Sequence, residues 1–222
     1  MTLIIATGNA HKVSEIAAFL GLAVVCISMK KLGTPPNVIE DAPTFKGNAA
    51  KKCSSLASWI QEDSSRLIGL NGSGPIAVLA DDSGLEVDFL QGAPGVHSAR
   101  FAHLDRNDRP GNAPDAENNA KLLRMLEGVE DPRRKARFRC VLAMLPLNQQ
   151  GVIEGAPLYF EGMCEGRILT TPTGDGGFGY DPLFVPDGHS VSFAELGSLI
   201  KNQISHRAQA LACLARSPLF QK

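Results

Sequence analysis

The stretch Pro-Ile-Ala-Val-Leu-Ala-Asp-Asp-Ser-Gly at residues 75–84 decides the fold class. Residues 75–80 form an apolar run that is typical of a buried β-strand. Two neighbouring carboxylates, Asp81 and Asp82, follow it directly. They repel each other unless a cation or basic group lies nearby, and hard divalent ions favour such oxygen ligands. Because ligands of open α/β sheets bind beyond the carboxyl ends of strands, the pattern favours a metal site over a solvated turn that ends at Gly84.

A second apolar run, residues 3–7, also predicts a buried strand near the start of the chain. Apolar residues then recur with helical spacing over residues 11–20, which predicts a helix. The connection contains Gly8, Asn9 and Lys12. Such a turn places N–H groups, a hydroxyl and a lysine around a helix N-terminus, where anions bind. The alternative is a plain strand–helix turn with Asn9 as its N-cap.

The rest of the chain mixes strand and helix patterns without a clean βαβ alternation, so the sequence predicts a mixed α/β fold. The turn at 81–84 is expected to pair the strand at 75–80 with another at 85–90. Further strands are expected at residues 24–28, 137–145, 158–168 and 183–185. Helices are expected from the N-cap Thr44 to about residue 60, over 115–126, from the capping-box residue Ser192, and from 198 to the C-terminus, with a break at Gly197.

Composition narrows the class of protein. The chain has 222 residues, 44% of them hydrophobic and 20% charged, with a net charge of −1. That balance gives no overall basic field for nucleic-acid binding. The five cysteines are widely spaced without a C-x-x-C pair, which favours reduced thiols over a disulfide framework or a structural zinc site. No apolar run approaches the ~20 residues of a transmembrane helix, so the expectation is a cytoplasmic protein that binds no membrane.

A glycine-rich loop lies at Thr173–Pro182, with the sequence TGDGGFGYDP. Its glycines spell G-x-G-x-x-G, the dinucleotide fingerprint, but that motif must follow a buried strand and open a helix. Here a polar Thr/Pro segment precedes the loop, and Pro182 disfavours helical geometry at Asp181. The loop is therefore better suited to bring backbone and the aromatic ring of Phe178 against a flat group.

A basic cluster on the last helix contains Lys201, His206 and Arg207, together with Ser205. The alternative interpretation of such a cluster is a solvated helix face. The sequence has no P-loop, no G-x-S-x-G and no H-E-x-x-H motif, so P-loop chemistry, acyl transfer and zinc hydrolysis lack their usual residues. An anion-binding turn, acidic residues, a stacking loop and a basic cluster together indicate a metal-dependent nucleotide-binding enzyme.

Six short motifs, in order, carry a resemblance to a known family. They are TGNAHK at residues 7–12, ADDSGL at 80–85, GAPG at 92–95 with SAR at 98–100, FGYDP at 178–182, AEL at 194–196, and KN at 201–202 with SHR at 205–207. In this order the chain resembles the inosine/xanthosine triphosphate pyrophosphatase family over about residues 2 to 212. Two segments depart from the family: the connection at 64–74 looks long, and 106–115 does not resemble the family pattern.

The resemblance implies an elongated α/β fold in which a long central mixed sheet carries two α/β lobes that flank a substrate cleft, in a single domain over residues 1–222. It also implies a homodimer. The implied activity is Mg²⁺-dependent hydrolysis of ITP, dITP and XTP to the nucleoside monophosphate and pyrophosphate, which removes mis-coding bases from the nucleotide pool.

For the phosphate end of the substrate, the resemblance implies that six consecutive residues bind the triphosphate: Thr7, Gly8, Asn9, Ala10, His11 and Lys12. Asp82 resembles the family's proton acceptor and metal ligand, with Asp81 as a neighbouring ligand. Glu40 resembles the second metal carboxylate. Asn48 and Lys52 are similar to residues on the phosphate side.

The resemblance also implies that Ser83, next to Asp82, touches the substrate. For the base end, it implies that four residues of the loop hold the base: Phe178, Gly179, Tyr180 and Asp181. Lys201, His206 and Arg207 are implied to contact the base edge and the phosphate side. The expected reaction is in-line attack of water on the α-phosphorus. Two alternatives remain: a Maf-like nucleotide pyrophosphatase, which prefers pyrimidine or modified nucleotides, and a nucleotide-binding sensor without catalysis.

Overall fold

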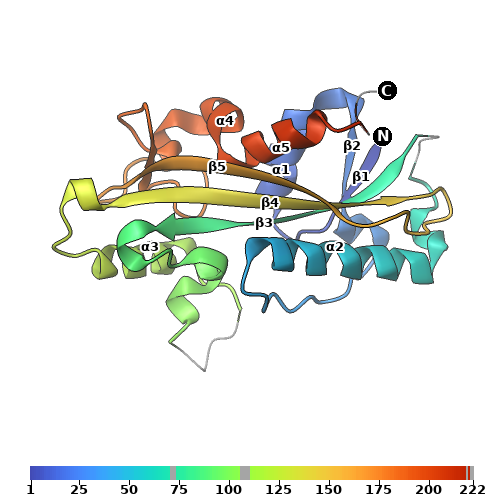
Figure 1. Cartoon of the computed structure of the whole chain (residues 1–222), viewed down its shortest axis with the longest axis horizontal. Coiled ribbons are helices and arrows are strands. Elements are labelled where there is room, and N and C mark those ends of the chain that lie inside the picture. Colours follow the sequence, from blue (N-terminus) through green and yellow to red (C-terminus); the bar gives the residue numbers. More distant parts are fainter. Residues whose placement is uncertain (71–73, 106–110, 219, 221–222) are drawn as a thin grey trace. The chain divides into compact units, whose positions relative to one another are not determined.

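The computed structural model describes residues 1–70, 74–105, 111–218 and 220. Parts of the two segments that depart from the family, 71–73 and 106–110, lie outside the described residues. The fold is mixed α/β, as predicted, with one sheet in the strand order β2-β1-β3-β4-β5-β6 (Figure 1). The strands are β1 (Thr2–Ile5), β2 (Val25–Ser28), β3 (Ile76–Val87), β4 (Lys135–Leu147), β5 (Leu158–Ile168) and β6 (Phe184–Pro186). The α-helices are α1 (Ala10–Leu20), α2 (Phe45–Glu62), α3 (Asp115–Met125), α4 (Phe193–Ile204) and α5 (His206–Ala215).

The sheet is mixed in strand direction, as expected. Strand β1 pairs in parallel with both β2 and β3, whereas β5 and β6 are antiparallel. The chain divides into two compact units. The first comprises Met1–Asp82, Cys140–Glu161 and Ala210–Lys222, and the second comprises Ser83–Arg139 and Gly162–Gln209. Strands β3, β4 and β5 each contribute residues to both units.

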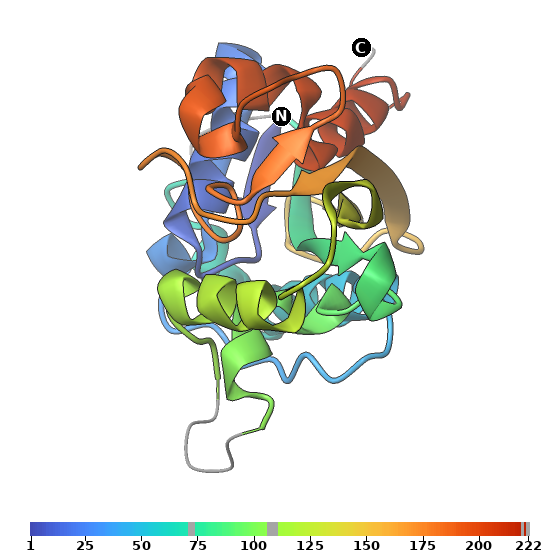
Figure 2. The same cartoon turned by 90° about the vertical axis from the view of Figure 1, so that its left-hand side faces the viewer.

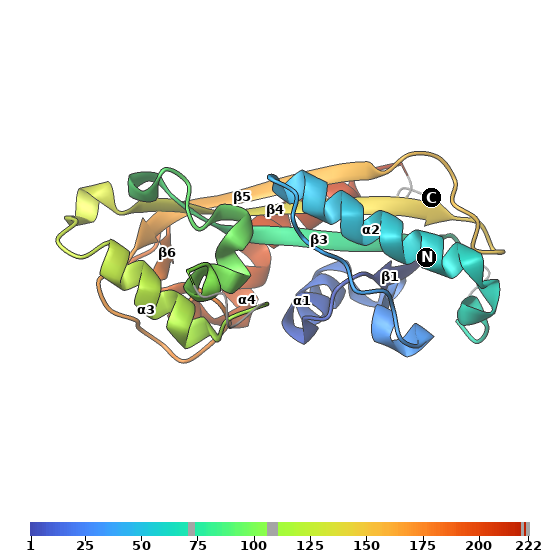
Figure 3. The ribbon, with the colours of Figure 1, turned by 90° about the horizontal axis from the view of Figure 1, so that it is seen from below.

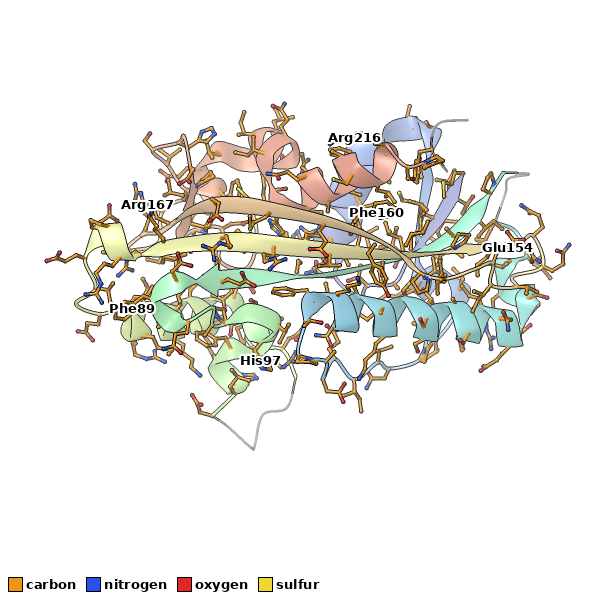
Figure 4. All side chains as sticks on the ribbon, in the orientation of Figure 1. Phe89, His97, Glu154, Phe160, Arg167 and Arg216 are labelled. Carbon is orange, nitrogen blue, oxygen red and sulfur yellow. The ribbon has the colours of Figure 1, made fainter. Side chains whose placement is uncertain are left out.

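In the first unit, helices cover both faces of the sheet. Helices α1 and α5 lie on one face and α2 runs along the other (Figures 1 and 3). Successive side chains of a strand point to opposite faces, so Ala77 and Leu79 pack with α1 and α5 while Val78 faces α2. Phe160 of β5, labelled in Figure 4, packs against the same cluster as Leu211 of α5.

The second unit has an aromatic core, around which α3 and α4 flank the strands (Figure 2). The ring of Phe138 on β4 lies 4.7 Å from the ring of Phe184 and 6.2 Å from that of Phe193. His206, the first residue of α5, stacks on Phe138 with a ring separation of 4.7 Å. This packing anchors the N-terminal ends of α4 and α5.

The expected turn at residues 81–84 is wrong. Strand β3 continues without interruption to Val87, where a short 3-10 helix replaces the rest of the strand expected at 85–90. The strand persists because its residues are almost all buried. As side chains alternate along a strand, Asp81 and Asp82 point to opposite faces of the sheet.

The C-terminal helices differ slightly from expectation. The break at Gly197 is confirmed, since its φ of +75° lies in the left-handed region that favours glycine. A second break at Ser205 separates α4 from α5. Within the described part of the chain, no helix is long and apolar enough to cross a membrane.

Candidate active site

The turn between β1 and α1 is closed by Asn9. Its Oδ1 accepts hydrogen bonds from the N–H groups of His11 at 2.9 Å and Lys12 at 3.3 Å, while Thr7 Oγ1 accepts one from the N–H of Asn9 at 3.2 Å. Asn9 is therefore the N-cap of α1, as expected for an ordinary strand–helix turn. Because two amides of the first turn are already paired, an anion would depend here on the Lys12 ammonium more than on those N–H groups.

Lys12 reaches from α1 to Asp81, and its Nζ forms an ion pair with Asp81 Oδ1. The other carboxylate oxygen, Oδ2, accepts a hydrogen bond from Cys140 Sγ at 3.2 Å. Asp81 is completely buried. This geometry favours Asp81 as the counter-ion that positions Lys12, in place of the expected role as a metal ligand beside Asp82.

Asp82 faces α2, where a second lysine lies. Lys52 Nζ is 2.7 Å from Asp82 Oδ1 and 2.9 Å from Glu40 Oε2, so one ammonium contacts two of the three predicted metal carboxylates. The side chain of Asp82 is 8% exposed and that of Glu40 is 37% exposed. Asp82 Oδ2 is buried and has no hydrogen-bond partner among the described residues.

The surroundings of Asp82 and Glu40 shift the pKa values of these two carboxylates in opposite directions. Burial raises the pKa of Asp82 to about 6 despite the opposing effect of Lys52. Burial alone would also raise the pKa of Glu40, but the Lys52 ammonium outweighs it and the pKa is lowered. For Lys52, burial lowers the pKa, and the two carboxylates overcome that effect and raise it. Paired carboxylates with divergent pKa values are a common arrangement where one of them handles a proton.

The residues present fit a divalent metal ion that completes its coordination with water and substrate. Among the described residues no group of three or more His, Cys, Asp or Glu side chains could hold a metal. Mg²⁺, however, is usually held by one or two carboxylates together with water and substrate phosphates. The unpartnered Asp82 Oδ2 beside Glu40 is an oxygen that a hard cation would satisfy.

Mg²⁺ affinity of the substrate-free protein is expected to fall by roughly tenfold for each pH unit below about 6. The reason is that the neutral Asp82 carboxyl, whose pKa is raised to about 6, must lose its proton before it can bind the ion. Calorimetric titration with Mg²⁺ at pH 5 and at pH 7 measures the difference. Asp82→Asn should abolish the pH dependence, and equal wild-type affinity at both pH values would contradict this assignment.

The loop that carries Glu40 is docked on the first turn of α2. Asn48 is fully buried, and its Oδ1 accepts a hydrogen bond from the N–H of Ala42 at 2.9 Å. At Gly47, an added Cβ would lie 2.7 Å from the Cβ of Ala42, so only glycine allows this approach. The structure thus gives Asn48 a part in holding the Glu40 loop, while the phosphate-side role that the family resemblance implies stays a prediction.

In the second unit, the loop at 173–182 presents the ring of Phe178 to two cations. Lys201 Nζ lies 4.2 Å from the ring centroid and the guanidinium carbon of Arg207 lies 5.9 Å from it. Asp181 Oδ2 accepts hydrogen bonds from Lys201 Nζ at 2.6 Å and from the N–H of Phe178 at 2.9 Å. Arg207 Nη2 also donates to Ser83 Oγ at 2.9 Å. Most of the residues predicted for the base end therefore lie together.

The glycines of this loop have a packing role. A Cβ at Gly174 or Gly176 would overlap the start of α4 at Ala194 and Glu195, and one at Gly177 would overlap the Asp181 carboxylate. Gly174 and Gly176 therefore let the loop backbone lie directly on α4, and Gly177 leaves room for the Asp181 carboxylate. The glycine whose Cβ position is open is Gly179.

The interpretation of the basic cluster as a solvated face is wrong, because Lys201, His206 and Arg207 are all at most 4% exposed. His206 stacks in the aromatic core on Phe138, so the structure assigns its ring a packing contact. Tyr180 is likewise buried, and its hydroxyl donates to the carbonyl of Ser98 at 2.9 Å. Burial raises the pKa of Tyr180.

Among the described residues, several that contact the predicted site residues were not identified from the sequence. Cys140 bonds Asp81, and Asp115 and Asn119 of α3 bond Gly179. In the sequence, Cys140 occupies a position typical of a core residue in an alternating strand, and Asp115 resembles an ordinary carboxylate at the start of a helix. Neither pattern therefore indicates a residue of a functional site.

The first unit therefore carries a carboxylate pair linked by a lysine, and the second unit carries an aromatic loop flanked by cations. These residue types suit an enzyme that hydrolyses nucleotides. The Ham1 family model matches residues 3–217, and the chain belongs to the Ham1 family. A dITP/XTP pyrophosphatase from Opitutus terrae is 44% identical, covering 97% of both chains. One from Desulforamulus reducens is 47% identical, over 95% of this chain and 92% of the relative.

Solved structures agree with this assignment. A HAM1 protein from Coxiella burnetii superposes with a TM-score of 0.75 at 36% identity, covering 97% of this chain and 96% of the other. The Ham1 protein of Staphylococcus aureus gives a TM-score of 0.74 at 30% identity, with 96% of each chain covered. The family resemblance inferred from the six sequence motifs is thus confirmed.

Proposed function

We propose that this protein hydrolyses the deaminated purine nucleotides ITP, dITP and XTP to the monophosphate and pyrophosphate. The observation that carries the proposal is the Glu40–Lys52–Asp82 cluster, in which a buried carboxylate of raised pKa lies beside a second carboxylate on a shared ammonium. Relatives named dITP/XTP pyrophosphatase over nearly the whole chain support it. The family resemblance further suggests a cytoplasmic homodimer that acts on free nucleotides, without nucleic acid or membrane as a partner.

At the phosphate end, Asp82 orients and deprotonates the water that attacks the α-phosphorus. A carboxylate with a pKa near 6 suits this task, because general bases work best when their pKa lies close to the operating pH. Lys12 and Lys52 offset the charge of the triphosphate. When bound by Glu40 and Asp82, Mg²⁺ supplies further neutralisation of phosphate charge.

At the base end, Phe178 offers a stacking surface and Arg207 offers hydrogen-bond donors. Hypoxanthine and xanthine carry a keto oxygen at position 6, which accepts such a bond, whereas adenine carries an amino donor there. A buried donor facing that amino group would lose its partner, at a cost of about 1–3 kcal/mol. Donors near the loop therefore favour keto purines.

The test is pyrophosphate release from ITP, dITP, XTP, ATP, dUTP and dTTP with Mg²⁺. Rapid hydrolysis of the three deaminated purines with release of pyrophosphate supports the proposal. Orthophosphate release would refute attack at the α-phosphorus. A preference for pyrimidine nucleotides would favour the Maf-like alternative, and binding of ITP without hydrolysis would favour a sensor.

A further inference from the structure

Gly179 of the loop is held at two points by one helix. Its N–H donates to Asp115 Oδ2 at 2.6 Å, and its carbonyl accepts a hydrogen bond from Asn119 Nδ2 at 3.0 Å. Asp115 begins α3 and Asn119 lies four residues later, so the two side chains project from the same face of the helix. The peptide groups on both sides of Gly179 are therefore fixed by α3.

The side-chain amide of Asn119 is energetically unfavourable at this position. The residue is 8% exposed, and its Oδ1 is buried with no hydrogen-bond partner among the described residues. A buried unpaired oxygen is unfavourable, so an apolar side chain would suit this position better unless the donor is needed. The bond from Nδ2 to Gly179 is a use of the amide that no apolar side chain could replace.

Gly179 directly follows Phe178 and has a φ of +64°, in the left-handed region. Since no atom lies within 4 Å of its Cβ position, the backbone conformation and not the available space requires glycine here. A left-handed residue next to Phe178 sets the direction in which the loop presents the ring. Asp115 and Asn119 hold the peptides that define this conformation.

We propose that Asp115 and Asn119 are positioning residues that determine base specificity by fixing Gly179 and, through it, the plane of Phe178. The inference rests on the proposed function, which assigns the purine to Phe178. In this proposal both residues act on the base only through Gly179. Discrimination between purines that differ in one donor or acceptor depends on a rigidly supported site, and α3 supplies that support.

The experiment compares ITP and ATP hydrolysis by the wild type and three variants. Asp115→Ala removes the acceptor for the Gly179 N–H, and Asn119→Asp keeps the side-chain shape but places an acceptor against the Gly179 carbonyl. Both should lower kcat/KM for ITP by roughly 10- to 100-fold, mainly through KM, and reduce the preference for ITP over ATP. Asp115→Asn retains an acceptor oxygen and should restore near wild-type behaviour.

Two controls separate positioning from general loss of structure. Glu117→Ala removes a carboxylate from the same turn of α3, 3.8 Å from His103, and should leave base preference unchanged. Inhibition by inorganic tripolyphosphate, which has no base, should be equal in all variants. An unchanged ITP-to-ATP ratio in Asp115→Ala and Asn119→Asp, or an equal loss of tripolyphosphate inhibition, would overturn the inference. A wild type that hydrolyses ITP no better than ATP would instead refute the proposed function and the inference with it.

Discussion

Asp82→Asn is expected to lower kcat for ITP hydrolysis by about 10²- to 10⁴-fold, the usual contribution of a general base. The amide keeps the shape of the side chain but cannot accept the proton of the attacking water. It also removes a negative charge from the pair with Glu40, so Mg²⁺ affinity should fall as well. Steady-state rates of pyrophosphate release and calorimetric Mg²⁺ titration measure the two effects. Near wild-type hydrolysis by this variant would show that Asp82 is not the base.

Asp81→Asn is the matched control, because it makes the same chemical change one residue earlier on the opposite face of β3. The structure pairs Asp81 with Lys12, so the variant should raise KM for ITP while Mg²⁺ affinity of the substrate-free protein stays at the wild-type value. A loss of Mg²⁺ affinity similar to that of Asp82→Asn would restore the original hypothesis that both carboxylates bind the metal.

Asp81 and Asp82 show which features of the site could be predicted from the sequence and which could not. The buried strand, the acidic pair and the need for nearby cations were all predictable from local composition. The face of the sheet to which each carboxylate points was not predictable, because a turn was expected at 81–84 and side chains alternate between faces only along a continuous strand. The lysines that compensate them come from α1 and α2, 69 and 30 residues away in sequence. A pairing over such separations is set by the fold and leaves no local pattern.

The C-terminal cluster gives the same lesson at the base end. Its residue types matched the family, but a run of basic residues is usually solvated, and the sequence left that option open. The decisive partner of Lys201 is Asp181, on a loop 20 residues earlier. The glycines of that loop were expected to bring the backbone against a flat ligand, whereas in the structure three of them closely approach α4 or the Asp181 carboxylate.

Asp181→Ala is expected to destabilise the protein by about 3–5 kcal/mol, because it removes one partner of a buried ion pair. Lys201 Nζ lies 2.6 Å from Asp181 Oδ2, and the two side chains are 5% and 2% exposed, respectively. Without the carboxylate, the ammonium would remain in the interior without its counter-ion. The N–H of Phe178 would also lose its acceptor. Urea unfolding followed by circular dichroism gives the free-energy difference.

The double variant Asp181→Ala/Lys201→Met tests the cause. If the loss comes from an uncompensated charge, removing the lysine should recover most of the stability that Asp181→Ala loses, since apolar replacement of a buried ion pair is often nearly neutral. If the double variant is as unstable as the sum of the two single variants, the ion pair is not the source of the effect. The recovered double variant should still bind ITP poorly, because Phe178 has lost both the hydrogen bond that fixes its backbone and the ammonium over its ring. The double variant would then show that the contributions of Asp181 to stability and to base recognition can be changed independently.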